Sequence, residues 1–214
     1  DGTLIKNINK LPAGNILEYK DNSIILNSYW KLDFSSKNEN ISFFDAVDKL
    51  DEKISRSINY RLIADVPVGA YLSGGVDSSI ICSYAREKNS NLNTFSIGFN
   101  SNDDELSNAK ITSKLLDTNH KEIICNDSDF ENFEKICWHL DEPIGDAIVL
   151  PMYLLSKEAS KDVKVVLSGE GGDEIFGGYL FHKTLLNINR YKKFIPSKIR
   201  KLLESIIHLV PHQL

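Results

Sequence analysis

The sequence has few cysteines and no long apolar run, and both absences restrict what the chain can be. Its three cysteines, Cys82, Cys125 and Cys137, are odd in number and widely spaced, and none belongs to a C-x-x-C pair. This argues against a disulfide framework and against a cysteine-based zinc or redox site. No apolar stretch approaches the length of a membrane span, and the N-terminus lacks a signal-peptide pattern. We therefore expect a cytoplasmic protein without a membrane partner.

Basic residues do not outnumber acidic residues, which removes the general electrostatic case for binding nucleic acid. The 25 Lys and Arg against 30 Asp and Glu leave a formal net charge of −5. Apolar residues make up 42% and charged residues 26% of the chain, as in ordinary globular proteins. The 214 residues suffice for one sizeable domain, or for one domain with an appendage.

Hydrophobic periodicity predicts strands that alternate with helices over most of the chain. Residues 42–62 carry apolar side chains at helical spacing, and Ser42 is a suitable N-cap. Short apolar runs predict strands at 66–72, 92–99, 121–125 and 163–167, and the segments between them predict helices ending near Lys88, Leu116, Leu140 and Ala159. Such alternation implies right-handed βαβ crossovers, and therefore an α/β fold with an open parallel sheet and helices on both faces.

The two ends of the chain have different patterns. Turn residues at 10–15 and apolar runs at 16–17 and 24–26 predict a short β hairpin before the sheet. The polar residues 35–40 predict a linker. After residue 196, apolar side chains share one helical face that must pack against something: Ile199, Leu202, Leu203, Ile206 and Ile207.

A motif rich in glycine and serine, residues 73–79 (SGGVDSS), lies between a predicted strand and a predicted helix. Open α/β sheets bind anions at such junctions, because unpaired N–H groups at the start of the helix face the crevice. Gly74 and Gly75 let the backbone approach a phosphate closely. Asp77 would repel that phosphate unless a cation such as Mg²⁺ lies between them. A glycine-rich turn without a ligand is the alternative interpretation.

The motif is not a Walker A loop, because no glycine in the chain precedes a lysine, and the spacing of a Rossmann loop is also absent. It resembles instead the pyrophosphate loop of the ATP-pyrophosphatase (PP-loop) superfamily. Members of that superfamily cleave ATP between the α- and β-phosphates, and the loop holds the departing pyrophosphate.

A second motif, residues 168–179 (SGEGGDEIFGGY), follows the last predicted strand. Three carboxylates and five glycines are a poor choice for a packed segment, because like charges repel and glycine loses the most entropy on ordering. A bound magnesium–nucleotide complex together with proton transfer would account for both features. An acidic, solvated loop is the alternative, but it does not explain the position after a strand.

Together, the two motifs resemble the synthetase domain of the asparagine synthetase family and not its GMP- or NAD-forming relatives. Residues 95–99 (FSIGF) and 141–146 (DEPIGD) match further segments of that family. The resemblance implies an adenine nucleotide alpha hydrolase-like fold that uses ATP and Mg²⁺. It also implies amidation of a carboxylate, most simply aspartate, through an acyl-adenylate with release of AMP and pyrophosphate.

The resemblance further implies roles for individual residues. Glu170 is the expected general base, taking a proton from ammonia as it attacks the acyl-adenylate. Asp77 and Asp173 are the expected Mg²⁺ ligands. The residues expected to contact ATP are two that flank adenine, Leu72 and Ile97, and a group that holds the pyrophosphate: Ser73, Gly74, Gly75, Asp77 and Ser78. Gly169 is expected to approach the nucleotide through its backbone, and Tyr179 to support the same pocket.

Family members carry a glutaminase domain before the synthetase domain, which gives the expected domain organisation. Residues 1–41 resemble the end of the glutaminase domain and its linker, and residues 42–214 the N-terminal part of the ATP-binding domain. We therefore expect a glutaminase domain in cis that supplies ammonia from glutamine, with a homodimer as one possible full-length form. These 214 residues alone are expected to be a fragment that does not complete turnover.

The acceptor and the activity have alternatives. Residues 146–150 (DAIVL) offer no guanidinium to grip aspartate, so another carboxylate, such as a sugar acid in polysaccharide synthesis, is an alternative acceptor. Another ATP pyrophosphatase, for example a tRNA-modifying or GMP-forming enzyme, is opposed by the second motif and by the missing C-x-x-C pairs. An inactive ATP-binding fragment is the remaining alternative.

His120 is a weaker signal outside both motifs. His120 and Glu122 fit the H-x-E part of a zinc deaminase signature, but the chain has no P-C-x-x-C partner for it. A histidine at a strand edge near the substrate crevice is therefore the favoured interpretation.

Overall fold

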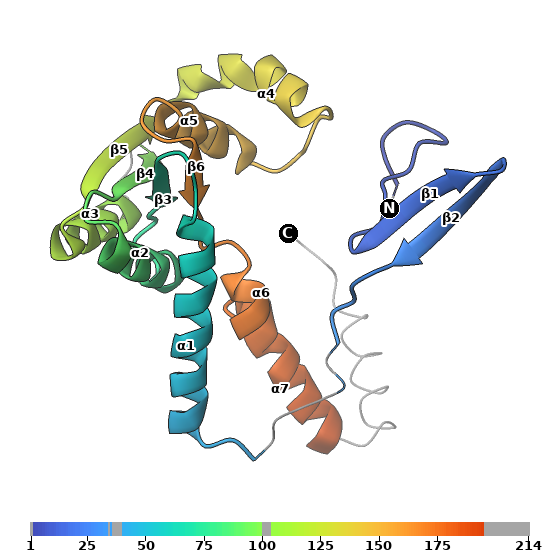
Figure 1. The fold of residues 1–214 in the computed structure, drawn as a ribbon, viewed down its shortest axis with the longest axis horizontal. Coiled ribbons are helices and arrows are strands. Elements are labelled where there is room, and N and C mark those ends of the chain that lie inside the picture. Colours follow the sequence, from blue (N-terminus) through green and yellow to red (C-terminus); the bar gives the residue numbers. More distant parts are fainter. Residues whose placement is uncertain (1, 34, 36–39, 100–103, 195–214) are drawn as a thin grey trace, which may run out of the picture.

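The apolar runs that predict strands form one parallel sheet in the computed structural model, which describes residues 2–33, 35, 40–99 and 104–194. Its strands are β3 (Val68–Tyr71), β4 (Asn93–Phe99), β5 (Asn119–Cys125) and β6 (Val165–Leu167). Their spatial order is β5-β4-β3-β6 (Figure 1), so the chain extends the sheet on one side of β3 and then returns to the other. The predicted open parallel sheet is confirmed.

Helices connect these strands much as the periodicity predicts. The described residues form the helices α1 (Phe43–Leu62), α2 (Val76–Lys88), α3 (Asp104–Leu116), α4 (Phe133–Leu140), α5 (Val149–Ala159), α6 (Gly172–Phe176) and α7 (Leu180–Phe194). The first of them begins where its N-cap is expected, because the Ser42 hydroxyl oxygen accepts a hydrogen bond from the Asp45 N–H at 3.1 Å.

Helices cover both faces of the sheet (Figure 1). Successive strand residues point to opposite sides, and the strands carry apolar residues on both, so each face needs cover. On one face, Ala70 and Leu72 belong to an apolar core that includes Ala85 of α2 and Ala109 of α3. On the other face, Phe95 packs with a core from α5 that includes Leu155. The expectation of helices on both faces is thus confirmed.

Two segments differ from the expected helical pattern. The helix expected to end near Leu140, for which the apolar pattern predicts a start at residue 130, begins only at Phe133. Residues 127–132 form a 3-10 helix capped by Asn126 and Asp129 instead. There the Asn126 N–H donates to the Asp129 carboxylate at 2.8 Å. Helices α6 and α7 were not expected, since the glycines of the second motif interrupt the apolar period.

The expected hairpin precedes the sheet, with β1 (Asn15–Lys20) antiparallel to β2 (Ser23–Ser28). Asp21 and Asn22 have φ angles of 49° and 61°, as both central residues of a type I′ turn do. Figure 1 shows the hairpin apart from the parallel sheet. The helical face expected after residue 196 lies outside the described residues.

The cysteines are free, in agreement with the sequence interpretation. Cys82 and Cys125 are buried, and Cys137 is half-buried. Burial raises the pKa of the Cys82 thiol to about 12, so this side chain serves packing and not thiolate chemistry. Within the described part of the chain, no helix combines the length and the apolar character that crossing a bilayer requires.

Candidate functional site

The first motif forms a tight loop between β3 and α2. Leu72, which leads into the loop, is fully buried, and its N–H donates to the Phe95 carbonyl oxygen at 2.9 Å. The N-cap of α2 is Gly75, which has no side chain to accept hydrogen bonds from the first helical N–H groups. N–H groups at such a helix start attract anions. The strand–loop–helix context expected for the motif is therefore present.

The serine hydroxyls of this loop bond to one another. Ser73 Oγ lies 3.0 Å from Ser78 Oγ. Ser78 Oγ donates to the Gly75 carbonyl oxygen at 3.2 Å and accepts from the Ser73 N–H at 3.2 Å. Because Ser78 Oγ has only one proton, Ser73 must be the donor between the two hydroxyls. Both hydroxyls would have to turn in order to reach a phosphate.

Parallel pairing of β3 with β6 brings the second motif onto the first. Residues 68–70 pair with residues 165–167, so both strands end at the same edge of the sheet. This edge lies where the strand order reverses direction, and open α/β sheets bind ligands at such a switch point. The two motifs, far apart in the sequence, therefore form one site.

Glycines allow the close approach of the two motifs. A Cβ atom at Gly172 would lie 2.4 Å from a carboxylate oxygen of Asp77, so any other residue would require that carboxylate to move. A Cβ atom at Gly169 would lie 3.1 Å from the amide nitrogen of Ser78. The backbone of the second motif thus lies directly against the start of α2.

A cavity of about 880 Å³ opens at this edge, between β3, β4, the two motifs and the start of α5. Most residues that the sequence analysis assigned to ATP, Mg²⁺ or proton transfer line it: Leu72, Ser73, Gly75, Asp77, Ser78, Ile97, Gly169, Glu170 and Asp173. Gly74 and Tyr179 are not among the described residues that line the cavity. The structure gathers the first group in one place, and the roles of all of them stay predictions.

The lining includes residues that the sequence analysis did not identify. Ala147, Ile148, Pro151 and Met152 form an apolar wall at the start of α5, and Ser96 of β4 lies in the lining as well. The signal in the sequence is the apolar segment directly after residues 141–146, which lacks a guanidinium. The wall borders the cavity because α5 packs against β4 of the sheet.

Carboxylates dominate the charged lining of the cavity. Asp77, Glu105, Glu170 and Asp173 line it, and its described lining contains no Lys or Arg. A triphosphate would be repelled here unless cations accompany it. Asp77 and Asp173 are oxygen donors in the same cavity, which suits Mg²⁺ bound by one or two carboxylates and by phosphates. The described residues contain no group of three or more His, Cys, Asp or Glu that could hold a metal by themselves.

The Tyr179 hydroxyl is bonded within the second motif. It donates to the Glu174 carboxylate at 2.6 Å, and this bond raises the pKa of Tyr179 and lowers the pKa of Glu174. The Tyr179 ring stacks on the Phe181 ring at a centroid distance of 5.3 Å. This geometry gives the tyrosine a partner outside the cavity lining.

If the cavity binds ATP, as the resemblance implies, the substitution Tyr179→Phe should change the KM for ATP by less than about threefold, because it removes an exposed hydrogen bond and keeps the ring. Steady-state kinetics with varied ATP concentration would measure this. A tenfold or larger increase would instead mean that the hydroxyl reaches the nucleotide, as the family resemblance implies.

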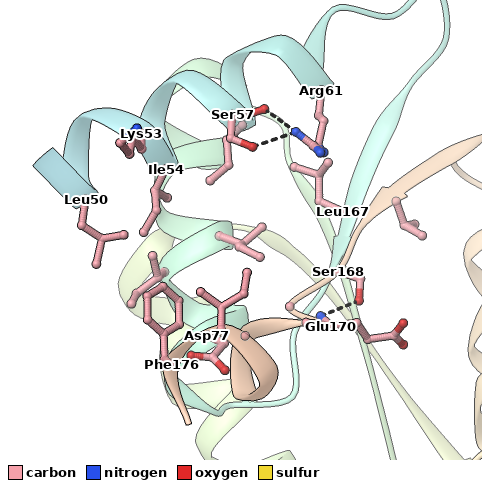
Figure 2. Close-up of a pocket in the computed structure, with 18 residues that line it drawn as sticks. Leu50, Lys53, Ile54, Ser57, Arg61, Asp77, Leu167, Ser168, Glu170 and Phe176 are labelled. Carbon is pink, nitrogen blue, oxygen red and sulfur yellow. Dashed lines mark hydrogen bonds between the residues drawn. The ribbon is translucent and has the colours of Figure 1, made fainter. Parts of the chain in front are cut away.

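A second cavity, of about 540 Å³, also borders the second motif, at residues 168–172 (Figure 2). Helix α1 provides one of its walls, where Arg61 Nη1 donates to Ser57 Oγ at 2.7 Å. Asp77, Ser168, Gly169 and Glu170 line both cavities. In Figure 2 the Glu170 side chain points away from Asp77. Glu170 therefore borders both cavities.

Comparisons with known proteins give one family. The family model described as asparagine synthase matches residues 49–212. An asparagine synthetase [glutamine-hydrolyzing] 1 from Bacillus subtilis (strain 168) is 36% identical over 212 residues, which cover 98% of this chain and 33% of the relative. A putative asparagine synthetase [glutamine-hydrolyzing] 2 from Methanocaldococcus jannaschii is 37% identical over 215 residues, covering 98% of this chain and 40% of the relative.

The chain thus spans between a third and two-fifths of the length of these two relatives. Among solved structures, an NH3-dependent NAD synthetase from Campylobacter jejuni aligns over 62% of this chain and 60% of its own, at 19% identity and a TM-score of 0.44. This structural likeness is weak, and the family match does not depend on it.

Proposed function

The chain belongs to the asparagine synthase family, and from this membership we propose that its larger cavity binds ATP for the adenylation and amidation of a carboxylate. The observation that carries the proposal is the meeting of the two motifs, residues 73–79 and 168–179, in one cavity at the carboxyl ends of β3 and β6. The proposed adenylation requires a loop for the pyrophosphate, and the amidation that follows requires a group that accepts a proton from ammonia. The two segments contain candidates for both.

The proposed reaction has two steps. An oxygen of the acceptor carboxylate attacks the α-phosphorus of ATP, the bond to the β-phosphate oxygen breaks, and acyl-adenylate and pyrophosphate form. Ammonia then attacks the acyl carbon, a proton leaves the nitrogen, and AMP departs as the amide forms. Since the relatives are named as glutamine-hydrolysing, glutamine is the proposed source of ammonia.

The residues of the cavity take separate parts in this proposal. Leu72 and Ile97 flank the adenine ring with apolar surface. The N–H groups at the start of α2, with Ser73 and Ser78, hold the departing pyrophosphate, and Gly169 lets the backbone approach the nucleotide. Glu170 takes the proton from ammonia. Because Glu170 borders both cavities, ammonia can approach through the smaller one while the adenylate fills the larger.

Asp77 and Asp173 are the proposed holders of Mg²⁺, which suits an acidic cavity without a described basic residue in its lining. The chemistry that the ion supplies when bound is charge neutralisation at the phosphates. The apolar wall of Ile148, Pro151 and Met152 excludes water, which protects an acyl-adenylate from hydrolysis.

We propose the domain organisation by analogy with the same relatives. Residues 1–41 would be the end of a glutaminase domain and its linker, and residues 42–214 would belong to the ATP-binding domain. The ion pair between Lys10 and Glu142 joins the first segment to residues 141–146. A glutaminase domain in cis would then supply ammonia without its release into solvent.

ATP–pyrophosphate exchange in the full-length protein tests this function. We expect exchange that requires an acceptor acid and that stops when EDTA removes divalent cations. Asp173→Asn should slow the exchange by at least about tenfold. The matched control, Asp162→Asn, removes a surface carboxylate that bonds Lys121 at 2.6 Å and should leave the rate unchanged. Absence of exchange with every acid offered would refute adenylation.

One observation favours a second candidate for the acceptor. The wall beside the acceptor's expected position is apolar, and no described lining residue is a cation that would grip the second carboxylate of aspartate. A larger or less charged carboxylate, such as a sugar acid, would suit such a wall. Exchange measured with aspartate and with sugar acids in parallel would separate the two: exchange with sugar acids and none with aspartate would favour this candidate.

A further inference from the structure

A row of buried hydroxyls lies beneath the first motif and meets a histidine that the proposed reaction does not use. Thr94 and Ser96 of β4 are 0% and 2% exposed. They share one face of the strand, and their neighbours on the other face are apolar. His120 of β5 lies directly opposite Thr94 and is half-buried. Its Nδ1 is 2.9 Å from Thr94 Oγ1, and its Nε2 is 3.2 Å from Ser96 Oγ.

The direction of each hydrogen bond in this row follows from one carbonyl group. The Ser96 hydroxyl donates to the carbonyl oxygen of Leu72, which can only accept. Ser96 Oγ has no second proton, so His120 must donate to it from Nε2. In the neutral ring Nδ1 then accepts, and the Thr94 hydroxyl is its donor. Thr94 Oγ1 in turn accepts from the Thr118 hydroxyl, 2.8 Å away.

The surroundings of the ring favour its neutral form. Burial lowers the pKa of His120, and the charges that face it, Glu122 of β5 and Lys110 of α3, act in opposite directions. These two charges also pair with each other at 3.6 Å. With both ring nitrogens bonded to hydroxyls, the geometry favours the strand histidine expected from the sequence over a zinc ligand.

The row ends at the first peptide of the first motif, whose residues 73–79 are called the phosphate loop from here on, after their proposed role. The carbonyl group of the Leu72–Ser73 peptide accepts from Ser96, and its N–H donates to Ser78 Oγ at 3.2 Å. The peptide plane is therefore fixed from both sides, once from the sheet and once from α2. Without the donor at Nε2, the Ser96 hydroxyl is free to rotate, and the bond from the sheet is no longer enforced.

We propose that His120 is a positioning residue for the phosphate loop. It donates to Ser96, which leaves the single Ser96 proton for the Leu72 carbonyl group and so fixes the plane of the first loop peptide. The consequence for ATP rests on the function proposed above, whereas the consequence for the loop itself does not.

Hydrogen exchange and NMR on the protein without nucleotide test the positioning directly. Nitrogen chemical shifts should show the neutral ring of His120 with its proton on Nε2. In His120→Phe and Ser96→Ala, the amides of residues 73–75 should exchange about tenfold faster, the effect of losing one hydrogen bond. His120→Gln retains a donor for Ser96 and should restore slow exchange. Unchanged loop exchange in both damaging variants, or a proton on Nδ1, would overturn the proposal.

Thr118→Val is the matched control, because it removes the far end of the row and leaves the His120–Ser96 bond in place. It should leave loop exchange within about twofold of wild type. If it disturbed the loop as strongly as His120→Phe, the row would act as general packing and the positioning role would be refuted. Far-UV circular dichroism would confirm that each variant is folded.

The catalytic arm uses ATP–pyrophosphate exchange. His120→Phe should raise the KM for ATP about tenfold and change kcat by less than about threefold, since no reacting atom is touched. The double variant with Ser96→Ala should be no worse than Ser96→Ala alone, because both act on the same bond. If the wild-type protein lacked exchange activity, the proposed function would fail, and the hydrogen-exchange arm would still decide the role of His120.

Discussion

Replacing Glu170 with glutamine should reduce amide formation by about 10²- to 10⁴-fold, the usual contribution of a general base. The variant keeps the size of the side chain and loses the carboxylate that is proposed to accept a proton from ammonia. Adenylation needs no such proton transfer, so ATP–pyrophosphate exchange should continue at close to the wild-type rate. Amide formation from ammonia and exchange should be measured on the same preparation of full-length protein.

Glu174→Gln is the matched control for this substitution. Glu174 belongs to the same acidic motif, but it bonds Tyr179 and is not among the described residues that line the larger cavity. We expect both half-reactions to persist in this variant. If Glu170→Gln abolished exchange as fully as amide formation, Glu170 would act in nucleotide binding and the assignment as general base would be wrong.

The second large effect is expected at Gly74, where alanine should destabilise the protein by about 2–4 kcal/mol and abolish ATP binding. Gly74 has a φ of +80°, in the left-handed region that disfavours side chains. A Cβ atom there would also lie 2.6 Å from the Ala109 amide nitrogen and 2.8 Å from the Glu105 carbonyl oxygen. Because these are backbone atoms of α3, the loop or the helix must move.

Gly75→Ala tests whether the destabilisation is specific to residue 74 or would follow alanine at either glycine of the motif. Gly75 has a φ of −73°, and the nearest atom to its Cβ is the rotatable Ser73 hydroxyl at 3.3 Å. We expect a loss below about 1 kcal/mol. Urea unfolding of both variants gives the comparison. Equal destabilisation by the two alanines would contradict the account from loop geometry.

Gly74 illustrates how far a motif can be understood from the sequence. The glycine pair indicates a loop that approaches an anion, but it does not say which glycine faces open space and which faces α3. That distinction depends on the packing of α3 against the loop. The same applies to Tyr179, since the sequence places it in the second motif and only the bond to Glu174 directs its hydroxyl.

The sequence by itself determined the strand–helix alternation, the positions of both motifs and the family, because these depend on local periodicity and on residue types at short spacing. Only the tertiary structure decided that the two motifs share one cavity. Residues 73–78 meet residues 168–173 because β3 pairs with β6, and strand order is a property of the whole sheet. The proton order from Thr118 to Leu72 likewise needs the register of β4 against β5. Contacts of this kind join residues distant in the chain, so no local pattern in the sequence encodes them.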